Sequence, residues 1–227
     1  MEFTMFEKLQ QLPLFQGLSI NELSFLLERV KLNFNQHAAN TIIASQDDCC
    51  DKLIYILNGK VCTEHHNANN KFIITEYLDA PHVIEPYNMF GMSQHYSHTY
   101  RFVTEGSTFS IDKRVFCDIL MNINIIKMNM LNMICYKLQM ATNDLRAKEA
   151  SGIEEKIKRF LKAYITRPTG KKVIMVKMED FAVILNESRL GVSKALNMME
   201  SKGIIMLKRR EIYIPEIKYL LNYNVND

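Results

Sequence analysis

Residues 178–214, MEDFAVILNESRLGVSKALNMMESKGIIMLKRREIYI, contain the pattern that decides the fold of the C-terminal third. MEDFAVIL favours a short helix, and the Asn186-Glu187 pair favours a turn after it. Ser188 is a good N-cap for a second helix, RLGVSKALNMMESK, and Gly203 is placed to end that helix. Two short helices joined by a tight turn predict a helix-turn-helix.

The second helix of this pattern has one apolar side and one polar side. The apolar side carries Val192, Leu196 and Met199, which we expect to face the interior of the domain. An arginine in the first turn of such a helix can donate two hydrogen bonds to a guanine. The polar side carries Ser188, Arg189, Ser193, Lys194 and Asn197. Spacing alone leaves open the alternative of a solvated basic helix in an ordinary α+β domain.

A basic hairpin follows the two helices. IIML and EIYI predict two short strands around Lys208, Arg209 and Arg210, which together form a β-hairpin wing. These three cations and Lys194 suit phosphate oxygens. Residues 1–150 contain 13 Lys and Arg against 16 Asp and Glu, whereas residues 151–227 contain 15 against 9. This asymmetry favours a nucleic-acid partner for the C-terminal part.

A different pattern extends from about residue 31 to residue 112. Short runs such as KLIYIL, KVCTE and FIITEYL are rich in Ile, Tyr, Phe, Thr and Val, and turn residues separate them. They predict a compact antiparallel β domain. Asn58-Gly59 predicts a hairpin that joins LIYIL to KVCTE, and residues 67–70 predict a second turn. Before this region, Ser19 and Glu22 form a capping box for a helix over INELSFLLERV.

Residues 113–150 contain no proline or glycine and predict one long helix, followed by a hinge at Ala150-Ser151-Gly152. Its apolar residues form two stripes at helical spacing, and each stripe needs a partner. We expect one stripe to pack on the β domain and the other on a second subunit, although a single broad stripe buried within the monomer is the alternative. The stripe assigned to dimerisation contains Leu131, Ile134, Leu138, Ala141 and Leu145; the other contains Ile119, Ile123, Ile126, Met130 and Met133.

Composition narrows the class of protein. The 227 residues are 48% hydrophobic and 23% charged, which is ordinary for a globular chain. No apolar run approaches the ~18 residues of a membrane span, and the N-terminus lacks the features of a signal peptide, so we expect a cytoplasmic protein without a membrane partner. Five cysteines without a C-x-x-C pair predict reduced thiols and no metal site. The absence of catalytic motifs predicts a protein that is not an enzyme.

The whole chain resembles the Crp/Fnr superfamily of bacterial transcription regulators. The resemblance rests on PLFQGLS, on QDDCCDKLIYILNGKV, and on EDFAVILNESRLGVSKALNMMESKGII. It implies an α+β architecture. Residues 1–112 would form an N-terminal antiparallel β-roll, jelly-roll-like and similar to a cyclic nucleotide-binding domain. Residues 113–150 would form a long dimerisation helix and hinge, and residues 151–227 a winged helix-turn-helix.

The resemblance also implies partners and contacts. Arg189 and Lys194 become the leading base and phosphate contacts of a homodimer on a near-palindromic DNA duplex, and RNA polymerase is a further expected partner. The family often has an acidic residue directly after this arginine, but Leu190 stands there. We therefore expect a different operator, in which Leu190 can meet a thymine methyl group.

The region expected to hold an effector departs from the family pattern. Members that bind cyclic nucleotides carry a Gly-Glu for the ribose and an Arg-Ser for the phosphate. Here Glu85-Pro86 and Thr99-Tyr100 stand at these places. Arg101 comes one residue later, which on a strand turns its side chain to the other face. We therefore expect no cofactor, and a β-roll that senses an unidentified effector or is independent of ligand.

Several alternatives stay open for this region. The candidate effector pocket contains Glu85, Tyr87, Thr99, Tyr100 and Arg101, and binding of a cyclic nucleotide through Arg101 is the alternative within it. A haem or metal site at the histidines, or a redox switch at the adjacent cysteines, is less favoured than partly exposed loop histidines and buried thiols. These residues are His82, His95, His98, Cys49 and Cys50. The competing class of function is a ligand-binding or protein-interaction module that does not read DNA.

Overall fold

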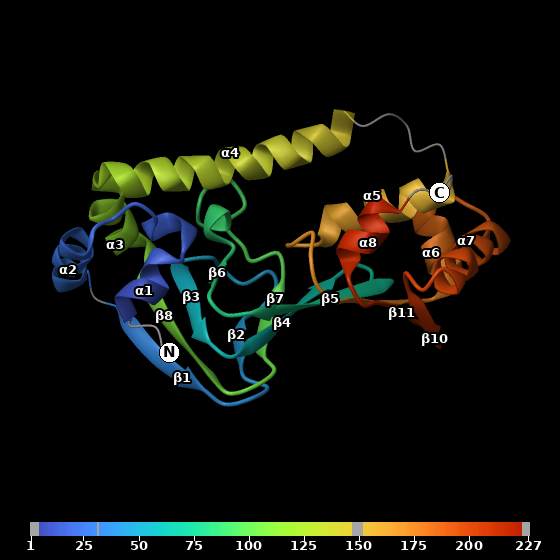
Figure 1. The fold of residues 1–227 in the computed structure, drawn as a ribbon, viewed down its shortest axis with the longest axis horizontal. Helices are drawn as coiled ribbons and strands as arrows, with labels where there is room; N and C mark the ends of the chain where they lie inside the picture. The colour runs from blue at the N-terminus through green and yellow to red at the C-terminus, as the bar shows by residue number, and fades with distance from the viewer. Residues whose placement is uncertain (1–4, 31, 147–151, 224–227) are drawn as a thin grey trace. The chain divides into compact units, whose positions relative to one another are not determined.

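Figure 1 shows the computed structural model of the chain, which describes residues 5–30, 32–146 and 152–223. The helices are α1 (Met5–Gln10), α2 (Ile20–Arg29), α3 (Lys113–Asp118), α4 (Asn124–Arg146), α5 (Ile153–Tyr164), α6 (Met178–Leu185), α7 (Arg189–Ser201) and α8 (Ile217–Asn222), with 3-10 turns η1 (Pro13–Phe15), η2 (Pro86–Met89) and η3 (Leu120–Asn122). The strands are β1 (Asn33–His37), β2 (Ile42–Ala44), β3 (Lys52–Asn58), β4 (Lys60–His66), β5 (Phe72–Asp79), β6 (His82–Ile84), β7 (Thr99–Phe102), β8 (Gly106–Asp112), β9 (Lys172–Val176), β10 (Met206–Lys208) and β11 (Glu211–Ile214).

The chain divides into two compact units. The first contains residues 1–61 and 78–140, and the second contains residues 62–77 and 141–227. The predicted boundaries 1–112, 113–150 and 151–227 stay a prediction. The units depart from them in two respects. Residues 62–77 group with the C-terminal part of the chain, and the second unit resumes at residue 141 and not at residue 151.

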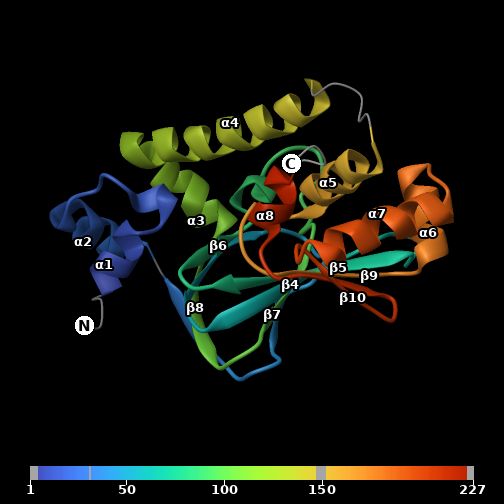
Figure 2. The same cartoon turned by 45° about the vertical axis from the view of Figure 1, so that its right-hand side comes forward.

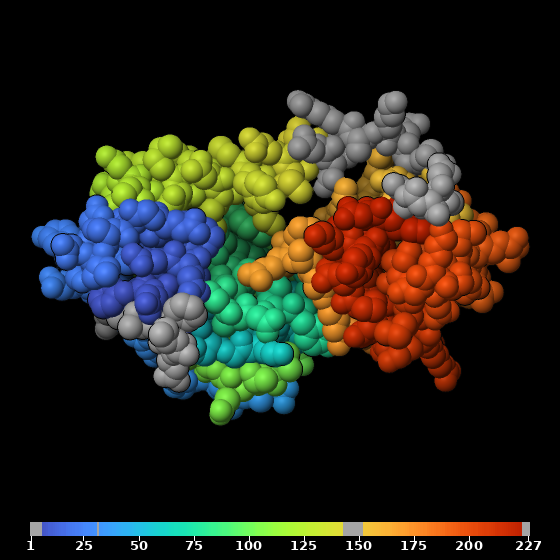
Figure 3. Space-filling model, in the orientation of Figure 1, coloured from blue at the N-terminus to red at the C-terminus, as the bar shows by residue number. Residues whose placement is uncertain are grey.

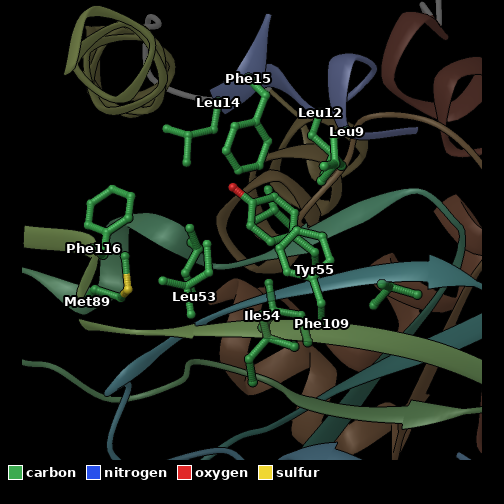
Figure 4. Packing of buried hydrophobic residues seen from close by; sticks show 14 of the residues in the cluster. Leu9, Leu12, Leu14, Phe15, Leu53, Ile54, Tyr55, Met89, Phe109 and Phe116 are labelled. Atoms are coloured by element: carbon green, nitrogen blue, oxygen red, sulfur yellow. The ribbon is translucent and has the colours of Figure 1, made fainter. Parts of the chain in front are cut away.

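The first unit is built on antiparallel strands, as the sequence predicts. One sheet has the order β1-β8-β3-β6, and β2 pairs with β7 elsewhere in the unit. The core lies between this sheet and the N-terminal helical segment. The ring of Tyr55 on β3 stacks on Phe109 of β8, with centroids 4.5 Å apart, and Phe15 covers its other side at 5.5 Å (Figure 4). The capping box of α2 is confirmed, because the Ser19 side chain accepts from the Glu22 amide and the Glu22 carboxylate accepts from the Ser19 amide.

The predicted hairpin at Asn58-Gly59 is wrong, although the turn exists. β3 is flanked by β8 and β6, whereas β4 is flanked by β5 and β7, so the two strands that the turn joins belong to different sheets. Gly59 has a φ of 95°, and a Cβ there would lie 2.7 Å from the Glu105 carbonyl oxygen. The glycine therefore lets the chain pass sharply from one sheet to another beside the backbone of residue 105. The second turn is confirmed, since Asn70 donates to the Asn67 carbonyl between β4 and β5.

The predicted single helix over residues 113–150 is also wrong, because α3, η3 and α4 replace it. The break lies at Ile123, whose ψ of 116° is extended. The Asn122 side chain donates to the Asp118 carbonyl, which is one of the local bonds by which asparagine competes with a helix. The break allows Phe116 and Leu120 to enter the core of the first unit. Residues 147–150 of the predicted helix lie outside the described residues.

α4 has the two faces that the sequence predicts. Ile126 and Met130 are buried against the first unit, with Ile119, Ile123 and Met133 packed beside them. The opposite surface of α4, yellow-green in Figure 3, forms an outer edge of this unit. The alternative of one broad stripe buried within the monomer is therefore wrong.

The second unit has the predicted winged helix-turn-helix order. α5, β9, α6 and α7 are followed by β10 and β11, which pair with each other, while β11 also pairs with β9 (Figure 2). As expected, Val192, Leu196 and Met199 of α7 are buried in the core of this unit. Gly203 follows α7 with a φ of 71°. In the predicted hinge, Ala150 and Ser151 lie outside the described residues, and Gly152 stands at the N-cap of α5.

Candidate nucleic-acid interface

The turn between α6 and α7 is fixed by local hydrogen bonds and a close helix contact. Asn186 ends α6 in the left-handed conformation, with a φ of 52°. The Ser188 hydroxyl accepts from the Gly191 amide at 3.0 Å and caps α7. A Cβ at Gly191 would lie 2.8 Å from Ile153 Cδ1, so glycine permits the first turn of α7 to pack closely on α5. An ion pair between Lys156 and Glu187 at 2.6 Å adds a further link between α5 and the turn.

The polar side of α7 is open to solvent within the second unit. Leu190 is 67% exposed, which is high for a leucine in a packed domain. Ser193 is partly exposed and is the least accessible of the candidate contacts. The exposed candidates are Ser188, Arg189, Leu190, Lys194 and Asn197. This side of α7 therefore presents hydrogen-bonding groups together with the apolar side chain of Leu190, a combination that suits the polar edges of bases and the thymine methyl group.

Arg189 has a partner that the sequence did not suggest. Its Nε lies 3.1 Å from Oε1 of Glu179 on α6, and both side chains are largely exposed. An exposed ion pair adds little stability, but this one places the guanidinium beside the first helix of the motif. Ten residues separate the partners, and only the folded turn brings them together.

The wing carries its cations at a two-residue turn. β10 and β11 pair as far as Lys208 opposite Glu211, and Arg209 and Arg210 form the turn between them. Arg210 has a φ of 62°, an uncommon conformation for a side-chain-bearing residue. Lys208, Arg209 and Arg210 are exposed. The predicted phosphate contacts of the wing are thus accessible on a short, paired hairpin.

In the candidate effector pocket, Glu85 is buried and surrounded by hydrogen-bond donors. It ends β6 in the left-handed conformation, with a φ of 32°. Its carboxylate accepts from the Ser97 amide at 2.7 Å, from the Ser97 hydroxyl at 2.8 Å and from the Tyr100 hydroxyl at 3.2 Å. The Asn88 amide nitrogen and His98 Nδ1 also lie 2.7 Å from it. The carboxylate is therefore engaged by its own protein on all sides.

The structure joins only part of the predicted pocket. Glu85 and Tyr100 meet, but Thr99 and Arg101 alternate with Tyr100 along β7 and so belong to the opposite face of that strand. Thr99 accepts from the Gln46 amide at 3.0 Å. Tyr87 lies in η2, where Lys137 Nζ is 4.9 Å from the centre of its ring. The five residues do not converge on one point.

His98 is the member of this cluster that sequence reasoning placed wrongly. The sequence predicts a partly exposed loop histidine, yet His98 is buried against Glu85. Burial alone raises the pKa of Glu85, but hydrogen bonds from His98 and Ser97 outweigh it, so the pKa of this carboxyl ends below its ordinary value. The signal in the sequence that could have indicated this cluster is a carboxylate followed, twelve to fifteen residues later, by Ser, His and Tyr.

The predicted dimerisation stripe lies on the outer face of α4. Leu138 is 65% exposed, and Leu131, Ile134 and Ala141 are exposed as well. The side chain of Leu145 lies outside the described residues. Sequence reasoning missed Met128 and Tyr136, which are also exposed on α4. The exposed apolar face is as expected, and dimerisation itself stays a prediction.

The histidines and cysteines considered as metal ligands or as a redox switch can be located in the part of the chain that the structure describes. No three of its His, Cys, Asp and Glu side chains group as metal ligands, and none of its helices is both long and apolar enough to cross a bilayer. The cysteines are free. Burial raises the pKa of the Cys50 thiol to about 11, so this thiol is protonated near neutral pH. Cys49 beside it is exposed, so the prediction of a buried thiol is wrong at this position.

The chain is similar to known proteins both in the sequence of its β domain and in its fold. The sequence profile of the cyclic nucleotide-binding domain matches residues 34–122. The catabolite activator protein of Thermus thermophilus has 17% identity and a TM-score of 0.54, with 92% of this chain and 96% of that chain covered. The chain has the Crp/Fnr fold. A Eubacterium rectale protein assigned to the Crp/Fnr family has 15% identity and a TM-score of 0.52, with 92% and 96% covered. No curated protein sequence matches the chain.

The Crp/Fnr fold agrees with the predicted fold class, which is therefore confirmed. It is an α+β chain with an antiparallel β domain of the cyclic nucleotide-binding type. The matched domain, residues 34–122, includes Glu85 and the whole predicted effector pocket.

Proposed function

We propose that this Crp/Fnr chain is a homodimeric, sequence-specific DNA-binding transcription regulator and not an enzyme. The observation that carries the proposal is the open polar side of α7, with Arg189 in its first turn and a cationic wing in the same unit. A recognition helix reads base edges with its N-terminal residues, while cations beside it bind phosphates. The names of the two similar structures, a catabolite activator protein and a Crp/Fnr family member, support the same role.

Each predicted contact has a role in this proposal. Arg189 would pair with a guanine, Leu190 would meet a thymine methyl group, and Ser188, Ser193 and Asn197 would complete the base contacts. Phosphate contacts would come from Lys194, Lys208, Arg209 and Arg210. RNA polymerase stays a predicted partner, and the cytoplasm stays the predicted compartment.

The outer face of α4 supports the proposed homodimer. A long helix with several exposed apolar side chains favours association with a second copy through the same face. Two recognition helices would then enter successive major grooves about 34 Å apart, and the operator would be nearly palindromic.

The test of DNA reading starts with selection of bound duplexes from a random pool, followed by titration of the selected duplex. We expect Arg189→Ala/Lys194→Ala to abolish specific binding, because it removes a base contact and a phosphate contact. Lys218→Ala on α8 removes an exposed charge of the same unit and is the matched control. Binding should also weaken steeply with salt. If the double variant binds like the control, the DNA reading is wrong and a ligand-binding or protein-interaction module becomes the better interpretation.

The test of the dimer is a charge pair on α4. We expect Leu131→Glu/Leu138→Glu to produce monomers in sedimentation, because four carboxylates would be buried in the shared face. Asn132→Glu/Gln139→Glu adds the same charges to exposed positions at another angle of the helix and should leave a dimer. If Leu131→Glu/Leu138→Glu sediments as a dimer like the wild-type protein, the outer face of α4 is not the dimer interface.

We also propose that the β-roll does not hold a cyclic nucleotide through Glu85. The support is the set of internal donors around this carboxylate, which leaves no oxygen of Glu85 for a ribose hydroxyl. The domain would then sense another effector or act without one. We expect millimolar cyclic AMP or cyclic GMP to leave the unfolding temperature and the DNA affinity unchanged. A shift of either quantity would contradict this proposal. If that shift then disappears in Arg101→Ala, the cyclic nucleotide binds through Arg101.

A further inference from the structure

The β4–β5 hairpin is built into the second unit, although its sequence lies within the match to the cyclic nucleotide-binding domain. β5 pairs antiparallel with β9 over five residue pairs, from Phe72 opposite Val176 to Glu76 opposite Lys172. The other edge of β9 pairs with β11 of the wing. The hairpin therefore supplies the strand that closes the open edge of the winged helix (Figure 2).

The side chains of β5 also share the core of the second unit. Phe72 and Ile74 are buried in the same cluster as the apolar residues of α5, α6 and α7. The ring of Phe72 meets those of Phe160 and Tyr164 edge-on, with centroids 4.9 and 5.0 Å apart. From β4, His65 adds a ring 4.9 Å from Tyr164. Removal of the hairpin would expose apolar surface in the middle of the winged module.

A buried ion pair fixes the register of this pairing. Glu76 and Lys172 lie 2.7 Å apart, and their side chains are 1% and 0% exposed. Glu76 also accepts from the Thr166 amide at 2.7 Å and from the Arg167 amide at 3.4 Å. Lys172 donates to the Thr169 carbonyl at 2.8 Å. Since an uncompensated buried charge is strongly destabilising, any opening of the hairpin must return both groups to water.

The paired hairpin leaves the reading surface open within the unit. Arg189, Leu190, Lys194 and Asn197 are all exposed while β5 occupies the edge of β9. The hairpin therefore does not block the proposed DNA contacts by covering α7. Both of its ends continue into the first unit, at residues 61 and 78. The hairpin joins the winged module non-covalently, through its pairing with β9 and the shared core, and so adds a second attachment to the chain that precedes α5.

We infer that residues 62–77 act as a strand latch, whose pairing with β9 holds the winged module for DNA binding and whose opening weakens that binding. The inference rests on the proposed function. A module held both by its linker and by strand pairing loses less freedom when it binds than one held by the linker alone. Opening of the latch would add this loss to each winged module of the dimer. The latch is thus the element through which changes at the base of the hairpin reach the DNA-binding surface.

The first arm of the test opens the latch in the full-length protein. Glu76→Gln leaves Lys172 buried opposite a neutral group. Asp79→Asn is the matched control, because the Lys60–Asp79 pair at the base of the hairpin is exposed and 3.9 Å long. We expect Glu76→Gln to speed amide hydrogen exchange at least 10-fold in β5 and β9, with β3 and β8 unchanged, and to weaken binding to the selected duplex at least 5-fold. The control should change neither quantity.

The second arm closes the latch again. Thr75 and Val173 face each other across the ladder, and facing residues of antiparallel strands have the Cα separation of about 4.5–5.5 Å that a disulfide needs. Thr75→Cys/Val173→Cys is added to Glu76→Gln, in protein whose exposed Cys49 and Cys135 are changed to Ser. We expect the oxidised form to recover slow exchange and duplex affinity, and the reduced form of the same protein to lose both.

Each outcome decides the inference. Unchanged exchange in β9 for Glu76→Gln, unchanged or tighter duplex binding after opening, or loss of binding on oxidation would each overturn it. If the wild-type protein binds no duplex, the proposed function fails and the role of the latch in DNA binding fails with it. In that case the exchange data still show separately whether the hairpin and β9 open as one structural element.

Discussion

The first turn of α7 and the Glu85 cluster use charge in opposite ways. Arg189 is largely exposed and forms one exposed ion pair, with Glu179. Glu85, in contrast, is buried and accepts hydrogen bonds from five donors. A charge with unused hydrogen-bonding groups is available to a ligand, while one that its own protein satisfies contributes to the fold. The comparison separates an exposed surface with hydrogen-bonding groups available to a ligand from a cluster that holds its own domain together, although the sequence predicted a site at both.

The largest expected effect comes from Glu85→Ala. It removes the buried carboxylate around which His98, Ser97 and Tyr100 are arranged, and with it the five hydrogen bonds that this carboxylate accepts. Removal of one member of a buried ion pair costs about 3–5 kcal/mol, and we expect the unfolding free energy of the first unit to fall by about this amount. Arg189→Ala, which breaks an exposed pair, should lower stability by less than about 1 kcal/mol.

Hydrogen exchange can measure this difference unit by unit. The slowest amides of β3 and β8 report on the first unit, and those of α7 and β9 report on the second. Glu85→Ala should speed exchange in the first set, while Arg189→Ala should affect neither. Equal effects of the two variants on β3 and β8 would mean that Glu85 is not the structural centre described above.

Much of the helix-turn-helix, the exposed region of this comparison, could be predicted from sequence because the residues that determine it are local. Ser188, Gly203 and the spacing of Val192, Leu196 and Met199 define the two helices without any distant contact. The turn at Gly59 shows the limit of this reasoning. Its glycine is recognisable, but the identity of the strands that pair on either side depends on residues fifty positions away.

The Glu85 cluster and the hairpin could not be predicted in this way. Glu76 meets the amide of Thr166, ninety residues later, and neither residue type signals a partner at such a distance. The helix expected over residues 113–150 failed for another reason. The absence of glycine and proline permits a helix. The break is favoured by the local bond of Asn122 and by the burial of Phe116 and Leu120, and local propensity does not encode that burial.

A second prediction separates base reading from phosphate binding within the exposed region. Arg189→Ala should cost about 1–3 kcal/mol in affinity for the selected duplex, a factor of roughly 10–100, and should relax preference at one base pair of each half-site. Arg209→Ala/Arg210→Ala should weaken binding to all duplexes alike and should flatten the dependence of log K on log salt by about two units per subunit.

Both variants are compared with Lys218→Ala by titration of the selected duplex and of single-base substitutions at several salt concentrations. A uniform loss for Arg189→Ala, with the base preference intact, would assign Arg189 to the phosphates. A change in base preference on loss of the wing arginines would place the wing in a groove.

The smallest expected effect is on the pH dependence of stability. The pKa of Glu85 is lowered in the folded state from its ordinary value of 4.5, because hydrogen bonds from His98 and Ser97 outweigh the effect of burial. The unfolded chain therefore binds more protons than the folded chain below pH 4.5, and stability falls as the pH falls through the folded pKa. Glu85→Gln, although less stable, should lose this part of the acid slope.

Glu22 is the exposed counterpart, since bonds from Ser19 lower its pKa at the surface. Solvent screening should make the slope lost in Glu22→Gln smaller than that lost in Glu85→Gln. Unfolding at a series of acidic pH values measures both slopes, and equal losses would show that burial adds nothing to the coupling between Glu85 and its donors.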